Sequence, residues 1–127
     1  MTMAEGMVRP DALSAHSGRL ELAVHLPWYR SLPISCLESV EVTVDGAAAA
    51  VDSVRVPGFA GRMAEAAVSD AQWDLRDPLA VSLDMAGRPG EEHQLEVAVA
   101  VRIPYIEQAP GVPLVQRVVV RTEGTVR

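Results

Sequence analysis

Side chains that could serve as bases, nucleophiles or metal ligands are few in this chain. It has three histidines, His16, His25 and His93, and a single cysteine, Cys36. No HExxH, paired CxxC, GxxxxGKS/T, GxGxxG or GxSxG pattern occurs, so the usual zinc, phosphate-binding, dinucleotide and serine-hydrolase motifs are missing from the sequence. Glu91 and His93 would share one side of a strand, but two ligands are too few for a tight metal site. We therefore predict no catalytic residue and no metal ligand.

The sequence around Cys36 and around His25 favours a structural role for each residue. Cys36 lies between Ser35 and Leu37 in an apolar stretch that leads into a strand, where a free cysteine is commonly a small buried hydrophobe. A nucleophilic cysteine would need a nearby base and an electropositive setting. His25 is expected on the outward side of a strand, on the same face as Glu21.

Length and composition exclude several classes of protein. With 127 residues, the chain forms one domain that can bury a core without disulfides or metals. One cysteine excludes an internal disulfide, and a formal net charge of −6 argues against nucleic acid and anionic membranes as partners. No apolar run approaches the roughly 20 residues of a membrane span, and the first residues lack the pattern of a signal peptide. We therefore expect a cytoplasmic protein.

Apolar and polar residues alternate along most of the chain, which is typical of half-buried strands. About six to eight antiparallel strands with short turns predict an all-β fold, a single-domain antiparallel β-sandwich of jelly-roll or immunoglobulin-like type over residues 16–127. One short helical turn is expected over residues 62–68, and a loosely ordered N-terminal arm over residues 1–15. The alternating runs are RLELAVHL (19–26), ESVEVTV (38–44), LAVSLD (79–84) and HQLEVAVAVRI (93–103).

The longest of these runs has an unusual second face. It carries Gln94, Glu96, Ala98, Ala100 and Arg102, so its ends are polar while its middle is small and apolar. A solvated face usually carries more polar groups there. Two interpretations remain open: alanine-rich composition alone, or a surface that another layer approaches closely.

Two of the few large aromatic residues stand side by side in the segment LPWYRSLPISC, where aromatic residues make up only 4% of the chain. Trp28 and Tyr29 are adjacent, so in extended chain they point in opposite directions and cannot both enter one core layer. Arg30 follows them, and Trp, Tyr and Arg are the residues enriched at interface hot spots. One ring is therefore expected to face outward or toward a partner.

A second proline-bounded segment, IPYIEQAPGVP over residues 103–113, ends the longest predicted strand. It carries Pro104 and Tyr105 and has the composition of a loop. It could lie at the same end of the sandwich as Trp28. We therefore take Pro104 and Tyr105, with Trp28, Tyr29 and Arg30, as candidate partner-interface residues.

These stretches closely resemble the small (β) subunit of bacterial C-glycoside deglycosidases. The similarity is most specific in LPWYRSLPISC (26–36), followed by ESVEVTVDG (38–46). It continues in PGEEH (89–93) and ends near RIPY (102–105). The resemblance covers about residues 19–121.

The resemblance implies a subunit of a two-component carbon–carbon lyase. Its large (α) subunit is a TIM barrel that holds a divalent metal, typically manganese, and forms a hetero-oligomer with the small subunit. The substrate is an oxidised C-glycoside with a ketone at C3. The ketone acidifies the C2 proton, the metal acts as a Lewis acid, a base removes the proton, and the aryl group leaves C1 by β-elimination. This chain would be the accessory, non-catalytic partner.

Two other functions remain as alternatives. One is a free-standing carbohydrate-binding β-sandwich, in which Trp28 and Tyr29 would stack on sugar rings. The other is a small self-sufficient enzyme, which the empty motif search disfavours.

Overall fold

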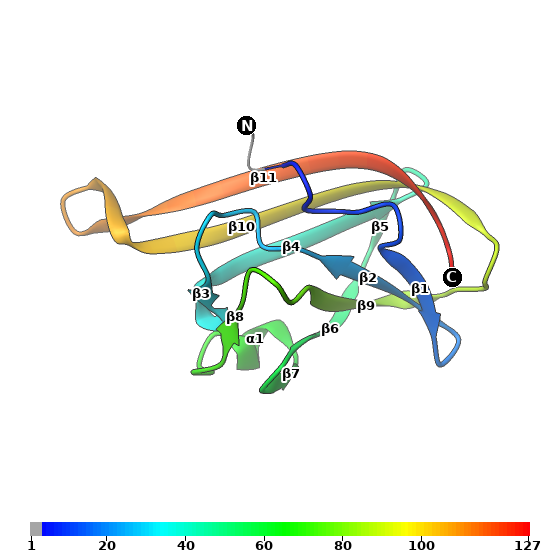
Figure 1. Ribbon diagram of the computed structural model, residues 1–127, viewed down its shortest axis with the longest axis horizontal. Coiled ribbons are helices and arrows are strands. Elements are labelled where there is room, and N and C mark those ends of the chain that lie inside the picture. The colour runs from blue at the N-terminus through cyan, green and yellow to red at the C-terminus, as the bar shows by residue number, and fades with distance from the viewer. Residues whose placement is uncertain (1–3) are drawn as a thin grey trace.

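Figure 1 presents the computed structural model of the chain, which describes residues 4–127. Over these residues two antiparallel sheets form the main layers, so the predicted all-β, sandwich-like fold is confirmed. One sheet has the strand order β1-β2-β9-β6-β7 and the other the order β11-β10-β4-β5, while β3 and β8 form a separate pair. The strands of the first sheet are β1 (Leu13–His16), β2 (Arg19–Val24), β9 (Leu79–Ala86), β6 (Val51–Val56) and β7 (Phe59–Gly61). Those of the second are β11 (Val112–Thr125), β10 (Glu92–Ala109), β4 (Leu37–Val44) and β5 (Ala47–Ala49), and the pair is β3 (Leu32–Pro33) with β8 (Gln72–Trp73).

The alternation of the sequence is the reason that the core forms between the two sheets. Successive strand residues point to opposite faces, so each alternating run supplies one apolar face. Leu22 in β2 and Val81 in β9 are fully buried and lie opposite each other in the first sheet. Val97 and Val99 in β10 are fully buried in the second sheet. The apolar faces predicted for these runs are confirmed.

The number of strands was underestimated. The described residues form eleven strands, not six to eight, because β3, β5, β7 and β8 contain only two or three residues each. Pairs this short contain too few residues to produce an alternation in the sequence. The predicted helical turn is confirmed as α1 (Met63–Ala66), and η1 (Ile34–Cys36) is a turn of 3-10 helix before β4.

The N-terminal segment differs from the loose arm that we expected. Residues 1–3 lie outside the described part, but residues 13–16 form β1 and pair with β2. Met7 and Leu13 are fully buried in the core. The last residue also contributes, because the backbone N–H of Ala15 donates to the carbonyl of Arg127 at 2.9 Å. The N-terminal segment has little apolar–polar alternation, so its sequence does not predict a strand. It becomes ordered because it packs against the sheets.

The strands β10 and β11 form a long hairpin that extends past the rest of its sheet (Figure 1). Pairing between β10 and β4 ends at Val101, opposite Leu37, whereas pairing with β11 continues toward the tip. We call residues 102–115 the hairpin arm; Arg102 and Val115 are register partners at its base. The loop expected over residues 103–113 was therefore wrong. Shifts in register between Ile103 and Ala109 allow the strands to continue despite their prolines.

The small residues on the outer face of β10 are covered by the chain itself. Ala98 and Ala100 are only 6% and 7% exposed, although they point away from the core. Their register partners are Val119 and Arg117 in β11 on one side, and Glu41 and Ser39 in β4 on the other. The longer neighbouring side chains therefore shield the two alanines from solvent.

Candidate functional site

The structure brings four of the five predicted interface residues into one aromatic cluster, made of Trp28, Tyr29, Arg30 and Tyr105. The indole Nε1 of Trp28 donates to the hydroxyl of Tyr105 at 2.6 Å, across 77 residues of sequence. The guanidinium carbon of Arg30 lies 5.0 Å from the centroid of the Tyr105 ring. The ring centroids of Trp28 and Tyr29 are 4.8 Å apart at an interplanar angle of 40°.

One of the two adjacent aromatic rings faces outward, as expected, but the chain bends here and the rings lie beside each other and do not point in opposite directions. Trp28 is half-buried and packs against the core, whereas Tyr29 is 56% exposed. Tyr105 is 47% exposed beside them. A hydrogen bond with Tyr105 is the main cause that raises the pKa of Tyr29 above its ordinary value. Tyr29 therefore stays neutral at physiological pH, and both tyrosines present amphipathic rings to the surface.

Contacts on both sides hold the cluster in place. The loop after β2 is anchored where Leu32 of β3 pairs with the buried Trp73 of β8. The hydroxyl of Ser31 accepts a hydrogen bond from the backbone N–H of Leu75 at 3.0 Å, which also places the exposed Leu75 beside this loop. The cluster thus belongs to an ordered region. Ordering its rings before binding lowers the entropy that a partner contact must overcome.

Arg102 connects β10, the strand that carries Tyr105, to the segment around Ser35 and Glu38. Its guanidinium forms an ion pair with Glu38 at 2.9 Å and donates to the carbonyl of Ser35 at 3.3 Å. These contacts link β10 to the junction of η1 and β4, just before the arm leaves the sheet. Pro104, the fifth predicted interface residue, follows at the base of the arm and is exposed.

Cys36 lies below this surface and is not prepared for nucleophilic chemistry. Its side chain is buried in η1, and Nη2 of Arg102 lies 4.0 Å from its sulfur. Burial is the largest influence and raises the pKa of the Cys36 thiol, while Arg102 acts in the opposite direction. The neutral thiol therefore dominates at neutral pH, and it behaves as a packed apolar group.

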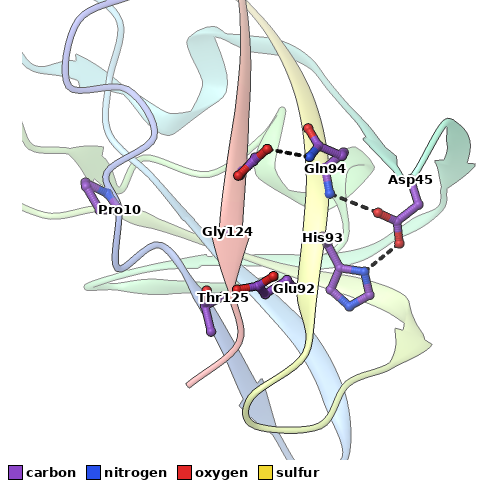
Figure 2. Close-up of a pocket in the computed structure, with 8 residues that line it drawn as sticks. Pro10, Asp45, Glu92, His93, Gln94, Gly124 and Thr125 are labelled. Atoms are coloured by element: carbon purple, nitrogen blue, oxygen red, sulfur yellow. Dashed lines mark hydrogen bonds and ion pairs between the residues drawn. The ribbon is translucent and has the colours of Figure 1, made fainter.

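A second group of polar residues lines a cavity of about 470 Å³ at the start of β10 (Figure 2). Nδ1 of His93 lies 2.6 Å from the carboxylate of Asp45, and the backbone N–H of Gln94 donates to the same carboxylate at 2.9 Å. These bonds lower the pKa of Asp45, with the His93 contact as the largest cause. The other lining residues include Glu92, Glu123 and Thr125.

The geometry of this second group fits a structural contact between the β4–β5 turn and β10 better than a catalytic role for His93 as a base. We call the contact of Asp45 with His93 and Gln94 the latch. The free ring nitrogen of His93, Nε2, is buried and has no hydrogen-bond partner among the described residues, so a substrate in the cavity has no access to it. Sequence reasoning treated the Asp45-Gly46 turn and the PGEEH stretch as unrelated signals. Their sequence separation of 48 residues hid a contact that only the pairing of β4 with β10 creates.

Glu91 and His93, which were considered and rejected above as half of a metal site, gain no further ligand in the described residues. Across residues 4–127, no three or more His, Cys, Asp or Glu side chains gather closely enough to hold a metal ion. The Glu91 carboxylate accepts a hydrogen bond from the backbone N–H of Arg88, at 2.6 Å, within its own turn. The described residues therefore offer no ligand set for a divalent metal, which the resemblance assigns to the α subunit. In the same range, no helix is long and apolar enough to span a membrane.

His25 also differs from its expected position. It follows the end of β2 and is half-buried, and its backbone N–H donates to the carbonyl of Met7 at 2.8 Å. Burial, followed by the charge of Arg9, lowers the pKa of His25. The N-terminal segment, which sequence reasoning placed elsewhere, is the reason that this histidine is covered.

A family profile described as C-glycoside deglycosidase beta subunit matches residues 14–105, which include Trp28, Tyr29, Arg30 and Tyr105. The chain belongs to this family. The match ends at Tyr105, so the outer part of the hairpin arm and all of β11 follow the matched segment.

Named relatives agree with membership of the C-glycoside deglycosidase beta subunit family. The chain is 34% identical over 113 residues to a 3'-dehydrocarminate deglycosidase beta subunit of Microbacterium sp, covering 87% of this chain and 85% of the relative. It is 32% identical over 103 residues to a C-glycoside deglycosidase beta subunit of Microbacterium trichothecenolyticum, covering 79% of each. A C-glycoside deglycosidase beta subunit of Arthrobacter globiformis is 31% identical over 114 residues, covering 87% of each.

Proposed function

We propose that this chain is the accessory, non-catalytic β subunit of a cytoplasmic C-glycoside deglycosidase complex. Membership of the beta subunit family carries the proposal. The substrate would be an oxidised C-glycoside, in keeping with the relative named for 3'-dehydrocarminate. The partner would be a TIM-barrel α subunit that holds the divalent metal, manganese in our proposal, and the catalytic base.

The reaction that we propose for the complex is a β-elimination. A ketone at C3 of the sugar acidifies the proton at C2, and a base removes it. The electrons form a double bond between C1 and C2, the bond from C1 to the aryl carbon breaks, and that carbon takes up a proton. The products are the free aglycone and an unsaturated keto sugar. This is a carbon–carbon lyase reaction.

The described residues of this chain support a role outside the chemistry. Cys36 is a buried neutral thiol, Nε2 of His93 is enclosed, and no set of side chains matches a metal site. The aromatic cluster supplies the contact instead, because exposed Tyr and Arg groups bury large area at a partner surface. We place the α subunit against Trp28, Tyr29, Arg30, Pro104 and Tyr105.

Separating the subunits tests the proposal. Each chain is purified alone and together, and each sample is assayed with a 3-oxo-C-glycoside and analysed for bound manganese. We expect cleavage only from the pair and metal only on the α subunit. Cleavage by the isolated small chain, or metal bound to it, would contradict the proposal.

A free-standing carbohydrate-binding module is the second candidate, and the exposure of Tyr29 is the observation that favours it. A sugar could stack on that ring, as on other aromatic platforms. Calorimetric titration of the isolated chain with glucosides distinguishes the two functions. Sugar binding without the α subunit would favour the module.

A further inference from the structure

The hairpin arm is built unlike a solvated loop. Between Ile103 and Gln116 the only charged residue is Glu107, in a chain that is 22% charged overall. Figure 1 shows the two strands projecting beyond β3 and β8, with no other strand beside them. A two-stranded ribbon is marginally stable by itself in water. A ribbon with so few charges therefore gains stability when another surface covers it.

Apolar side chains stand exposed along this ribbon. Val112 near the tip is 43% exposed, Val115 at the base is 44% exposed, and Tyr105 on the opposite strand is 47% exposed. Exposed apolar groups gathered on one element mark an interaction surface more often than scattered ones do. Tyr105 also belongs to the aromatic cluster, so the arm and the cluster form one continuous surface.

The edges of the arm determine how a partner can bind. Pro104 lies in β10 and Pro113 in β11, and proline has no N–H to donate to an added strand. Prolines on both strands, together with the shifts in register, oppose strand addition by a second copy of this chain. A partner is therefore expected to contact the arm through side chains, and an apolar groove would cover its exposed valines and Tyr105.

The charge beside the arm indicates the chemistry of that groove. Among the described residues, no carboxylate lies within ion-pair distance of the Arg30 guanidinium, which sits over the Tyr105 ring at the base of the arm. A groove that covers Tyr105 would desolvate this cation. A carboxylate on the partner would compensate for the lost hydration.

We propose that the hairpin arm, residues 102–115, docks into an apolar groove of the large subunit whose rim carries a carboxylate opposite Arg30. This inference rests on the proposed function, since it takes the α subunit as the occupant. It adds a second anchor to the aromatic cluster and assigns a role to the part of the chain that follows the family match. The arm engages the α subunit by side-chain packing and not by strand pairing.

Two single variants test the arm, Val112→Asp and Val115→Asp, and Val68→Asp is their control. Val68 is 87% exposed, follows α1 and lies outside the arm, so it matches the chemistry of the substitution. All three sites are exposed, and unchanged melting temperatures verify folding. If Val115→Asp does not fold, Val112→Asp at the tip carries the test. Binding to the co-expressed α subunit from the same genome is measured by calorimetry, and hydrogen exchange of residues 104–113 is compared in the free and bound chain.

We expect each arm variant to bind the α subunit about 30-fold or more weakly, because a charge replaces buried apolar area, while Val68→Asp binds like the wild type. Exchange of the arm amides should slow in the complex. Wild-type binding that both arm variants preserve would overturn this inference and leave the proposed function intact. Absence of wild-type binding would overturn both. A wild-type chain that self-associates, and whose arm variants are monomeric, would show that a second copy is the occupant.

Discussion

Trp28 and Tyr105 are joined by a hydrogen bond of 2.6 Å from the indole Nε1 to the phenol oxygen. The bond connects the loop after β2, in one sheet, to the base of the hairpin arm, in the other sheet. Both rings remain partly accessible, so the bond orders a surface and does not fill the core. It therefore links the fold of the two sheets to the proposed contact with the α subunit.

Trp28→Phe and Tyr105→Phe each remove this hydrogen bond and keep an aromatic ring. A neutral hydrogen bond at a partly exposed site contributes about 1 kcal/mol, so each variant should unfold slightly more easily. The effects should not add in the double variant, because both substitutions remove the same bond. Urea denaturation of the four proteins measures the coupling. Strict additivity would mean that the bond contributes nothing in solution.

Tyr29→Ala separates binding from stability. The ring is 56% exposed, so its loss should change the free energy of unfolding by about 0.5 kcal/mol or less. Affinity for the α subunit should fall about 10-fold or more, since exposed tyrosines that become buried are common hot spots. Val68→Ala is a control at another exposed apolar site. Equal affinities of Tyr29→Ala and wild type would remove Tyr29 from the interface.

Asp45→Asn tests the latch between the β4–β5 turn and β10. The folded chain holds the pKa of Asp45 below its ordinary value of 3.8, first through His93 and then through the N–H of Gln94. A lowered pKa means that the carboxylate contributes stability above pH 3.8, and that this contribution disappears as the pH falls through the folded pKa. Wild type should therefore melt at a higher temperature than Asp45→Asn at pH 6, with the gap closing below about pH 4. A gap that does not depend on pH would contradict this role of the charge.

Cys36→Ala tests whether the thiol has any part in the chemistry. The side chain is buried and burial raises the pKa of its thiol, so iodoacetamide should react slowly with the folded chain at pH 8 and rapidly after unfolding in urea. The assembled complex containing Cys36→Ala should keep its rate of C-glycoside cleavage, at a cost of about 1 kcal/mol in stability. A large loss of activity in a folded complex would assign the thiol a catalytic role.

Local sequence patterns predicted most of the scaffold and part of the candidate site. The alternation around Leu22, Val81 and Val97 predicted which faces are buried, since side-chain direction in a strand depends only on position along it. Trp28 and Tyr29 could be singled out because they are adjacent in a chain with few aromatic residues, although their rings lie side by side and not on opposite faces. The short strands and the burial of Met7 were missed, because neither produces a repeating pattern. The arm was missed because its prolines are typical of loops and were expected to end the strand.

The sequence by itself determined that this is an all-β chain of the C-glycoside deglycosidase beta subunit family, and which strand faces form its core. Only the tertiary structure decided that Trp28 meets Tyr105, that Asp45 meets His93, and that the hairpin arm projects beyond its sheet. The reason is that alternation and family motifs are local along the chain. Contacts across 77 or 48 residues depend on the register of paired strands and on how the sheets pack, which the whole core sets together.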